Sequence, residues 1–275
     1  GDSLKITAAL NKPSSERLII NLSEAGSATI GTDYSFIGFK QNKIEIESND
    51  GGESISGFEV DVLGNIYFTR YNTLQKWESE DSLFPEIGGG SKGNAADQLD
   101  GPKGVARDEE GNVYVADYNN HRIQKFTAGS ENKEGITVAG GNGAGSEANQ
   151  LRYPWDVILD SAGNLYISDL GNNRIQKWVI NESSGSTVAG GNGAGNSSKQ
   201  LYLPKNIKFN SSEELFVADA GNNRIQKFPK NSTSASLAST LAGGNGSGNN
   251  SNQLNNPSDI IIDEYENIYI DDQDN

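Results

Sequence analysis

Cysteine is absent from this sequence of 275 residues, and histidine occurs once, as His121. The missing cysteine excludes disulfide bonds, thiolate metal sites and a cysteine nucleophile. The single histidine excludes a metal site built from several histidine ligands. No apolar run approaches the roughly 18 residues of a membrane span, so we expect no membrane insertion. Methionine is also absent and the chain begins at Gly1, so we expect a processed or trimmed product.

Positive charge is also scarce. The chain has 37 acidic and 22 basic residues and a formal net charge of −15. A surface that binds phosphates needs the opposite sign, so we expect no nucleic-acid partner. Acidity of this kind fits solubility outside a cell and favours divalent cations. The composition therefore favours a secreted or cell-surface protein.

An internal repeat dominates what the sequence does contain. The pattern DEEGNVYVADYNNHRIQKF recurs at residues 61–77, 108–126, 160–178, 210–228 and 263–275, with the first copy degraded and the last truncated. The copies start 47, 52, 50 and 53 residues apart. A second pattern, GGNGAG followed by NQL, lies between them at residues 140–151, 190–201 and 243–254. Fixed periods of this length indicate a repeat architecture.

Each unit is predicted to form four short strands. In the second unit the expected strands are residues 104–107, 113–116, 122–126 and 136–139. Val113 and Val115 alternate with Tyr114 and Ala116, which is the period of a strand. No stretch carries a sustained 3.6-residue apolar period, so helices should be nearly absent. Four strands in about 50 residues are typical of a propeller blade.

The repeated GN, aromatic strand, Asp and NNRIQK elements resemble NHL repeats over residues 56–275. The resemblance implies an all-β fold, an NHL-type β-propeller of four-stranded blades. About five blades are present, whereas NHL propellers usually carry six. The last copy stops at Asn275, before the strand equivalent to residues 122–126. An open half blade leaves unpaired strand edges, so we expect either a longer parent protein or closure by the N-terminal strands, and we favour a fragment.

The first 55 residues differ from the repeats. Residues 4–36, with the turn Gly31-Thr32-Asp33-Tyr34, resemble the opening half of a Calx-β domain, a calcium-linked β-sandwich. This divides the chain into residues 1–55 and 56–275; the alternative is that residues 1–55 form an irregular first blade. The resemblance implies a calcium role for Asp33 and for Asp50. Half a domain supplies too few oxygen ligands, so we predict weak calcium binding at most, no other cofactor and no complete metal site.

An acidic and a basic residue recur five positions apart in each complete copy. The pairs are Asp117 and Arg122, Asp169 and Arg174, and Asp219 and Arg224. Across a hairpin the carboxylate can accept amides of the turn and pair with the guanidinium. A residue repeated in every blade shapes the blade, so we predict a structural role for all six.

The residue after the proline that opens each unit differs from copy to copy. These residues are Lys103, Trp155, Lys205 and Ser258. A ligand breaks the symmetry of repeated blades, so we expect function where the copies diverge, near one rim or the mouth of the channel. The ligand-binding candidates are Lys103, Tyr153, Trp155, Tyr202 and Lys205. The alternative is ordinary packing of aromatic residues between blades.

Two further features have structural interpretations. The glycine runs loosely resemble a phosphate loop, but neither a helix start nor a Lys-Ser/Thr pair follows them, so we predict flexible connections between blades. His121 stands where Asn173 and Asn223 stand in the sister copies, which predicts a turn residue.

These patterns favour an extracellular module that binds a protein or a glycan through a propeller face, within a larger bacterial surface or adhesin-like protein. No catalytic residue is predicted. Two alternatives remain open: a metal-dependent propeller enzyme of lactonase or lyase type, and a structural spacer in a repetitive surface filament. A unique polar cluster in the channel would favour the enzyme.

Overall fold

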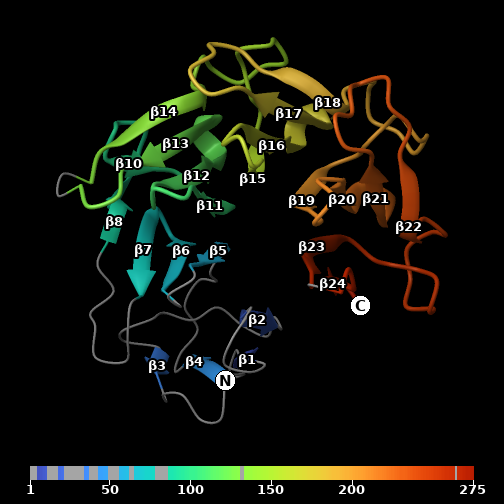
Figure 1. The fold of residues 1–275 in the computed structure, drawn as a ribbon, viewed down its shortest axis with the longest axis horizontal. Coiled ribbons are helices and arrows are strands. Elements are labelled where there is room, and N and C mark those ends of the chain that lie inside the picture. Colours follow the sequence, from blue (N-terminus) through green and yellow to red (C-terminus); the bar gives the residue numbers. More distant parts are fainter. Residues whose placement is uncertain are drawn as a thin grey trace.

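The computed structural model describes the strands at residues 5–10, 18–21, 34–36 and 43–48 by their backbone. It describes residues 56–61, 65–77, 86–130, 133–263 and 265–275 with their side chains. Asp33 and Asp50, the residues tied to the calcium prediction, lie outside the described residues. The sheets are arranged around a central axis as a β-propeller (Figure 1).

Four sheets have four strands each, paired in chain order. Blade 1 consists of β5 (Gly57–Val60), β6 (Ile66–Arg70), β7 (Thr73–Trp77) and β8 (Glu86–Gly89). Blade 2 consists of β11 (Val105–Arg107), β12 (Val113–Asp117), β13 (Arg122–Phe126) and β14 (Gly135–Gly140). Blade 3 consists of β15 (Pro154–Leu159), β16 (Leu165–Asp169), β17 (Arg174–Trp178) and β18 (Ser186–Gly190). Blade 4 consists of β19 (Pro204–Phe209), β20 (Leu215–Asp219), β21 (Arg224–Phe228) and β22 (Ser239–Gly243).

A fifth sheet, called partial blade 5, has two strands, β23 (Pro257–Ile262) and β24 (Ile268–Asp272). The four complete blades and the half blade expected from the repeats are therefore present.

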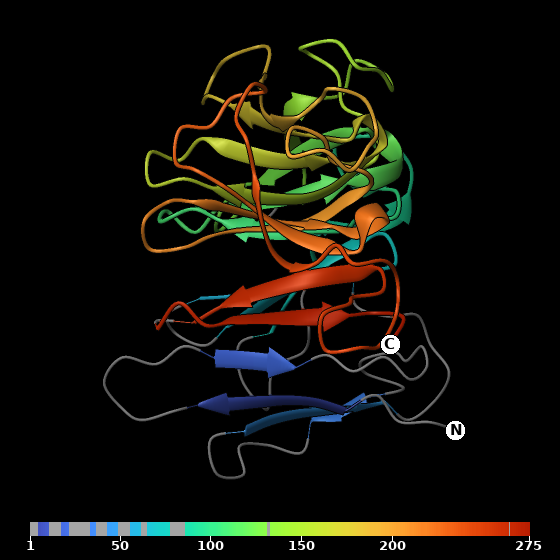
Figure 2. The same ribbon diagram turned by 90° about the vertical axis from the view of Figure 1, so that its right-hand side faces the viewer.

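The N-terminal strands form a sheet of another kind. They are β1 (Lys5–Leu10), β2 (Leu18–Asn21), β3 (Tyr34–Phe36) and β4 (Lys43–Ser48). Their order is β2-β1-β4-β3, which is not the sequential order of the blades. In Figures 1 and 2 this sheet lies beside β23 and β24. The division at residue 55 and the Calx-β resemblance stay predictions.

Blades 2, 3 and 4 turn sharply between their second and third strands. A single turn of 3-10 helix bridges them, at η1 (Tyr118–Asn120), η2 (Leu170–Asn172) and η3 (Ala220–Asn222). The next residue is left-handed in each case: His121, Asn173 and Asn223 have φ of 56°, 55° and 52°. Asparagine tolerates this conformation. These turns are the helical segments of the described chain, so the expected all-β fold is confirmed, and no described helix could span a membrane.

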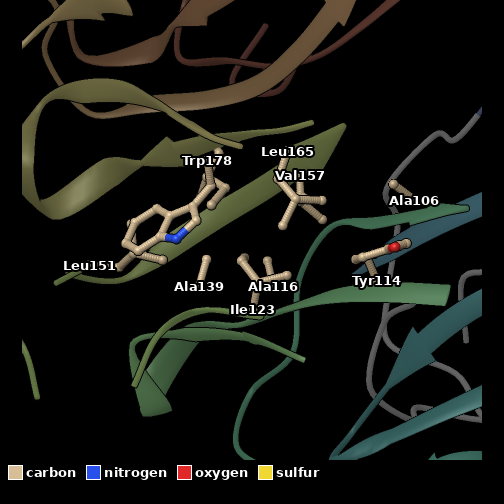
Figure 3. Packing of buried hydrophobic residues seen from close by; sticks show 10 residues of the cluster. Ala106, Tyr114, Ala116, Ile123, Ala139, Leu151, Val157, Leu165 and Trp178 are labelled. Carbon is tan, nitrogen blue, oxygen red and sulfur yellow. The ribbon is translucent and has the colours of Figure 1, made fainter. Parts of the chain in front are cut away.

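The core lies between neighbouring blades. Figure 3 shows Val157 and Leu165 of blade 3 facing Ala116 and Ile123 of blade 2, with Trp178 closing the cluster. All five side chains are buried. The first strands β5, β11, β15, β19 and β23 lie side by side around the central axis, and the region that they surround is called here the channel.

The glycine-rich segments connect the blades, as expected, and hydrogen bonds within each loop fix its shape in the structure. In the segment before blade 3, Asn142 Nδ2 donates to the Asn149 carbonyl, and Gln150 Nε2 donates back to the Asn142 carbonyl. Leu151 at its end is fully buried. A fourth copy that the sequence comparison missed lies at residues 88–99, where β9 (Ser91–Lys92) pairs with β10 (Gln98–Leu99) as its sister loops pair through single bridges.

Candidate functional site: the channel and its mouth

The first strand of three blades is irregular where it begins. The pairing of β15 with β16 shifts between Pro154 and Asp156, and β19 and β23 show the same shift next to their opening prolines. Such bulges re-aim side chains and are common next to binding sites. Trp155 sits on the shift in blade 3, so its side chain departs from the strict alternation of the strand.

Trp155 lies between two lysines from the neighbouring blades. The Nζ of Lys103 lies 5.1 Å from the centre of the indole ring, and the Nζ of Lys205 lies 5.2 Å from it. Both distances fall within the range of cation–π attraction. Lys205 also donates to Gln273 Oε1 at 2.8 Å. The structure thus brings three of the five sequence candidates into one cluster, called here the mouth cluster.

Tyr153 joins this cluster through the turn of blade 2. The Tyr118 ring lies 5.0 Å from that of Tyr153 and 5.9 Å from that of Trp155, edge-on to the latter. The fifth candidate, Tyr202, makes no ring contact with these residues within the described chain, and its ring covers the backbone of Gly221 instead. Of the three aromatic candidates, Tyr153 and Trp155 therefore belong to the mouth cluster and Tyr202 does not.

Deeper along the same strands lies a group of charged residues that the sequence analysis did not single out. Glu59 on β5, Asp156 on β15, Lys208 on β19 and Asp259 on β23 influence one another electrostatically across the channel. This channel cluster has three acids and one lysine. Its members lie two to four residues after the start of their strands, further along the strands than the mouth cluster.

Asp156 is the most buried member. Its Oδ1 accepts the N–H of Val157 at 2.9 Å, and its Oδ2 accepts the N–H of Ile207 in blade 4 at 3.0 Å. Gly104 of blade 2 lies against the carboxylate so closely that a Cβ there would collide with it. Burial raises the pKa of Asp156 to about 6, although Lys208 and the two amides oppose the shift. The carboxyl therefore titrates close to neutral pH.

The other members share this environment. Burial raises the pKa of Glu59 and of Asp259, and in each case the charge of Lys208 opposes the rise. Burial alone would lower the pKa of Lys208, but the charges of Asp156, Glu59 and Asp259 outweigh it and raise this pKa. Lys208 thus stays protonated and acts as the shared countercharge of three carboxyls.

A signal for the channel cluster was present in the sequence. Aligned on their opening residues, the first strands carry Gly57, Gly104, Asp156, Asn206 and Asp259 at one position. Two residues later they carry Glu59, Ala106, Ile158, Lys208 and Ile261. These positions diverge as strongly as the mouth positions. Within the described residues, no group of three or more carboxylates and imidazoles is arranged to hold a metal ion.

The repeated aspartates bind more than the turn. Asp169 is fully buried and accepts from Arg174 Nε at 2.7 Å and from Asn172 Nδ2 at 2.8 Å. Its other oxygen accepts the N–H of Arg152 at 2.7 Å. This amide lies 17 residues earlier, at the end of the glycine-rich loop, and not in the turn as expected. Asp117 and Asp219 repeat the arrangement.

His121 makes a contact between blades. Its Nδ1 accepts the N–H of Tyr153 at 3.1 Å, where Asn173 Oδ1 accepts the N–H of Leu203 at 2.9 Å. The ring also meets that of Tyr153 edge-on, with centroids 4.7 Å apart. His121 is therefore a turn residue, as expected, with a second role at the blade interface.

Two segments of the chain match a known family by sequence. Residues 99–126 and 151–178, which cover most of blades 2 and 3, match the NHL repeat. They are NHL repeats. The human protein "NHL repeat-containing protein 3" is 32% identical over 111 residues, which is 38% of this chain and 30% of that protein. The chain thus matches less than a third of that relative's length.

Several solved structures share the fold at low sequence identity. A virginiamycin B lyase from Staphylococcus aureus, an inactive variant with quinupristin, has a TM-score of 0.61 at 14% identity and covers 98% of this chain and 78% of its own. An auxiliary nutrient binding protein from Bacteroides ovatus has a TM-score of 0.59 at 14% identity, and the match covers 84% of this chain and 59% of that protein. A gluconolactonase from Xanthomonas campestris has a TM-score of 0.59 at 12% identity, and the match covers 84% of this chain and 73% of that protein. At these identities the likeness concerns the fold alone.

Proposed function

We propose that this propeller is an extracellular binding module whose ligand, a protein or a glycan, docks at the mouth of the channel. The arrangement of Lys103, Trp155 and Lys205 supports this proposal most directly. Two ammonium groups flank one partly exposed indole at a point where the repeat is broken. Convergent polar groups beside an aromatic surface are typical of ligand sites.

The chemistry of the mouth cluster selects the ligand. The ammonium groups attract an anionic group, while the indole offers a flat apolar surface for a sugar ring or a planar side chain. The two lysines carry a charge opposite to the net charge of the chain. We infer a ligand that carries a carboxylate or sulfate next to a ring.

A binding screen with acidic and neutral glycans and peptides tests the proposal, followed by calorimetry on the best ligand. Trp155→Ala and Lys205→Gln should each weaken binding at least tenfold, since aromatic and charged anchors dominate small interfaces. Tyr265→Ala is the matched control, because Tyr265 is 77% exposed and follows the far end of a first strand. Equal losses in the control and in Trp155→Ala would contradict this location of the site.

A second candidate function, an enzyme of the channel, is favoured by Asp156. A buried carboxyl with a pKa of about 6 suits general acid–base chemistry near neutral pH. Among the similar folds are a lyase and a gluconolactonase. Assays on lactones and esters with the chain and with Asp156→Asn test this alternative. A turnover that Asp156→Asn abolishes while leaving ligand binding intact would establish it.

A further inference from the structure

The backbone is left-handed one residue before the proline that opens blades 2, 3 and 4 and partial blade 5. The φ angles are 58° at Gly101, 54° at Tyr153, 50° at Leu203 and 58° at Asn256. Glycine and asparagine adopt this conformation readily, whereas a tyrosine or a leucine does so only when its surroundings impose it. The contacts that hold Tyr153 are therefore part of how the mouth cluster is built.

The preceding blade holds each of these residues by its backbone amide. At three of the four junctions the acceptor is an asparagine side-chain oxygen, and the donors are the amides of Gly101, Leu203 and Asn256. At the remaining junction the N–H of Tyr153 donates to Nδ1 of His121 at 3.1 Å. Of these four acceptors, only the imidazole can take up a proton near neutral pH. The junction with the different acceptor is the one that carries the aromatic residues of the mouth cluster.

Tyr153 is connected to Trp155 in two ways. Along the chain only Pro154 separates them, and its ring fixes φ, so a change in the backbone of Tyr153 is passed on to Trp155. Through space the ring of Tyr118 lies between them, 5.0 Å from that of Tyr153 and 5.9 Å from that of Trp155. The imidazole of His121 lies 4.7 Å from the Tyr153 ring on the other side of this series. The four rings form a series, called here the aromatic row, that ends at Trp155.

Protonation of His121 would remove the acceptor at the start of the aromatic row. A neutral imidazole has one nitrogen that accepts, whereas an imidazolium has two N–H groups and no acceptor. The N–H of Tyr153 would then face another N–H, and the left-handed backbone would lose the bond that holds it. An asparagine oxygen accepts the same amide at every pH. His121 therefore makes this one junction sensitive to pH.

The charged groups that face His121 come from both blades. Burial lowers the pKa of His121, and Arg152 of blade 3 adds to this effect, whereas Asp169 of blade 3 and Asp117 of blade 2 oppose it. Each of these aspartates is bound to the arginine of its own blade. Burial raises the pKa of Tyr118, so this phenol stays neutral below pH 10. The imidazole is thus neutral at pH 7.5 and gains its proton below its ordinary value near 6.5.

We propose, on the basis of the function inferred above for the mouth cluster, that His121 is a positioning residue of the ligand site. The neutral imidazole fixes Tyr153 and with it the aromatic row, and protonation loosens the row and weakens the bound ligand. The positive charge that the imidazole gains would by itself attract an anionic ligand and strengthen binding. The two effects have opposite signs, so the direction of the change separates positioning from simple attraction.

The probe is glucose 6-sulfate, titrated into the full chain at pH 7.5 and pH 5 and followed by nuclear magnetic resonance of the backbone amides. Its sulfate stays ionised over this range and adds no pH dependence of its own. Between pH 7.5 and pH 5 the natural chain should lose about fivefold in affinity relative to His121→Asn, which corresponds to about one hydrogen bond. Titration of Asp156 affects both proteins alike and cancels in this comparison.

His121→Ala completes the set, because it removes the acceptor at every pH. It should bind the probe weakly at both pH values, whereas His121→Asn restores tight binding at both. Circular dichroism verifies that each protein keeps its fold at pH 5. An equal pH dependence in the natural chain and in His121→Asn would overturn the proposal. Stronger binding of the natural chain in acid, relative to His121→Asn, would also overturn it in favour of attraction by the imidazolium charge.

A second measurement needs no ligand. The indole N–H signal of Trp155, identified by its loss in Trp155→Phe, should shift with the same midpoint as the ring signals of His121, and this shift should be absent in His121→Asn. A Trp155 signal that does not follow His121 would overturn the proposal. Probe binding that is absent, or that Trp155→Ala leaves unchanged, would instead count against the function proposed for the mouth cluster, and the indole signal would still decide the role of His121.

Discussion

His121 shows how one residue can keep the shape of a repeat and change its response to pH. Its Nδ1 takes the place of the asparagine oxygen that joins the later blades. Burial lowers the pKa of His121, and nearby Arg152 adds to this effect. A protonated Nδ1 cannot accept the N–H of Tyr153. The neutral imidazole is therefore the form that holds blades 2 and 3 together.

We predict that His121→Asn removes a pH dependence of stability and preserves the hydrogen bond from the N–H of Tyr153. Because the folded-state pKa lies below the unfolded value near 6.5, the histidine's contribution is present above that value and is lost as pH falls through the folded pKa. Urea unfolding at pH 7.5 and pH 5 measures this effect. At pH 5 the free energy of unfolding of the variant should exceed that of the natural chain by up to about 1 kcal/mol more than at pH 7.5. Identical pH profiles of the two proteins would contradict this role.

At the scale of elements, the glycine-rich loops depend on left-handed backbone at chosen positions. Gly190 has φ of 66°, and a Cβ there would lie 2.5 Å from the Asn173 carbonyl oxygen. Gly193 in the same loop has φ of 79°, with open space around its Cβ position. The two glycines share the backbone requirement, but steric exclusion acts on Gly190 alone.

Gly190→Ala should therefore destabilise the fold more than Gly193→Ala. The backbone conformation alone costs alanine about 1 kcal/mol, which is the expected loss for Gly193→Ala. Gly190→Ala adds a collision with backbone that cannot move without breaking the β17–β18 pairing. Thermal unfolding of the two variants compares them directly. A loss for Gly193→Ala as large as that for Gly190→Ala would show that φ, and not space, controls both positions.

The elements that repeat were predictable, and those that differ were not. The strand expected at residues 122–126 coincides with β13, and the strand at 104–107 is one residue longer than β11. Repeated strands pack on repeated neighbours, so the same side chains recur. The first strand instead faces the channel, where each blade meets different partners, and its charged residues Asp156 and Lys208 fell outside the shared pattern. Part of what holds the glycine-rich loops is bonds to their carbonyls from an asparagine and an arginine 24 to 28 residues later, which composition does not reveal.

At the scale of the whole molecule, the channel concentrates opposing charges from four separate sheets. Asp156 has its pKa raised from 3.8 to about 6, so folding favours its protonated form. Its contribution to stability is fully present below the unfolded pKa and is lost as pH rises through about 6. Asp156 thus stabilises the fold more at mildly acidic pH than at neutral pH. The exposed carboxylates of the outer turns, whose pKa is lowered, do not share this dependence.

We predict that Asp156→Asn becomes more stable relative to the natural chain as pH rises from 5 to 7.5. An asparagine is already present at the equivalent position of blade 4, where Asn206 Oδ1 accepts the N–H of Ile260, so the fold tolerates the change. Asp263→Asn is the control, because hydrogen bonds from Asn267 lower the pKa of Asp263, so this carboxyl stays ionised in the folded and the unfolded chain and its replacement should change stability equally at pH 5 and at pH 7.5. Guanidinium unfolding across this pH range measures both. If the difference in free energy of unfolding between Asp156→Asn and the natural chain did not change with pH, the carboxyl of Asp156 would be ionised throughout this range.

The left-handed residue that ends each turn has one more consequence. Blade 2 meets blade 3 through His121, blade 3 meets blade 4 through Asn173, and blade 4 meets the fifth sheet through Asn223, each by one acceptor and one amide. These three junctions therefore share the same contact, a side-chain acceptor of one blade bound to a backbone amide of the next. A gene that duplicated or deleted one unit of about 50 residues would create no junction of a new kind, and only the curvature of the ring would have to adjust. Copy number in this architecture can thus change by recombination between units without the invention of new contacts.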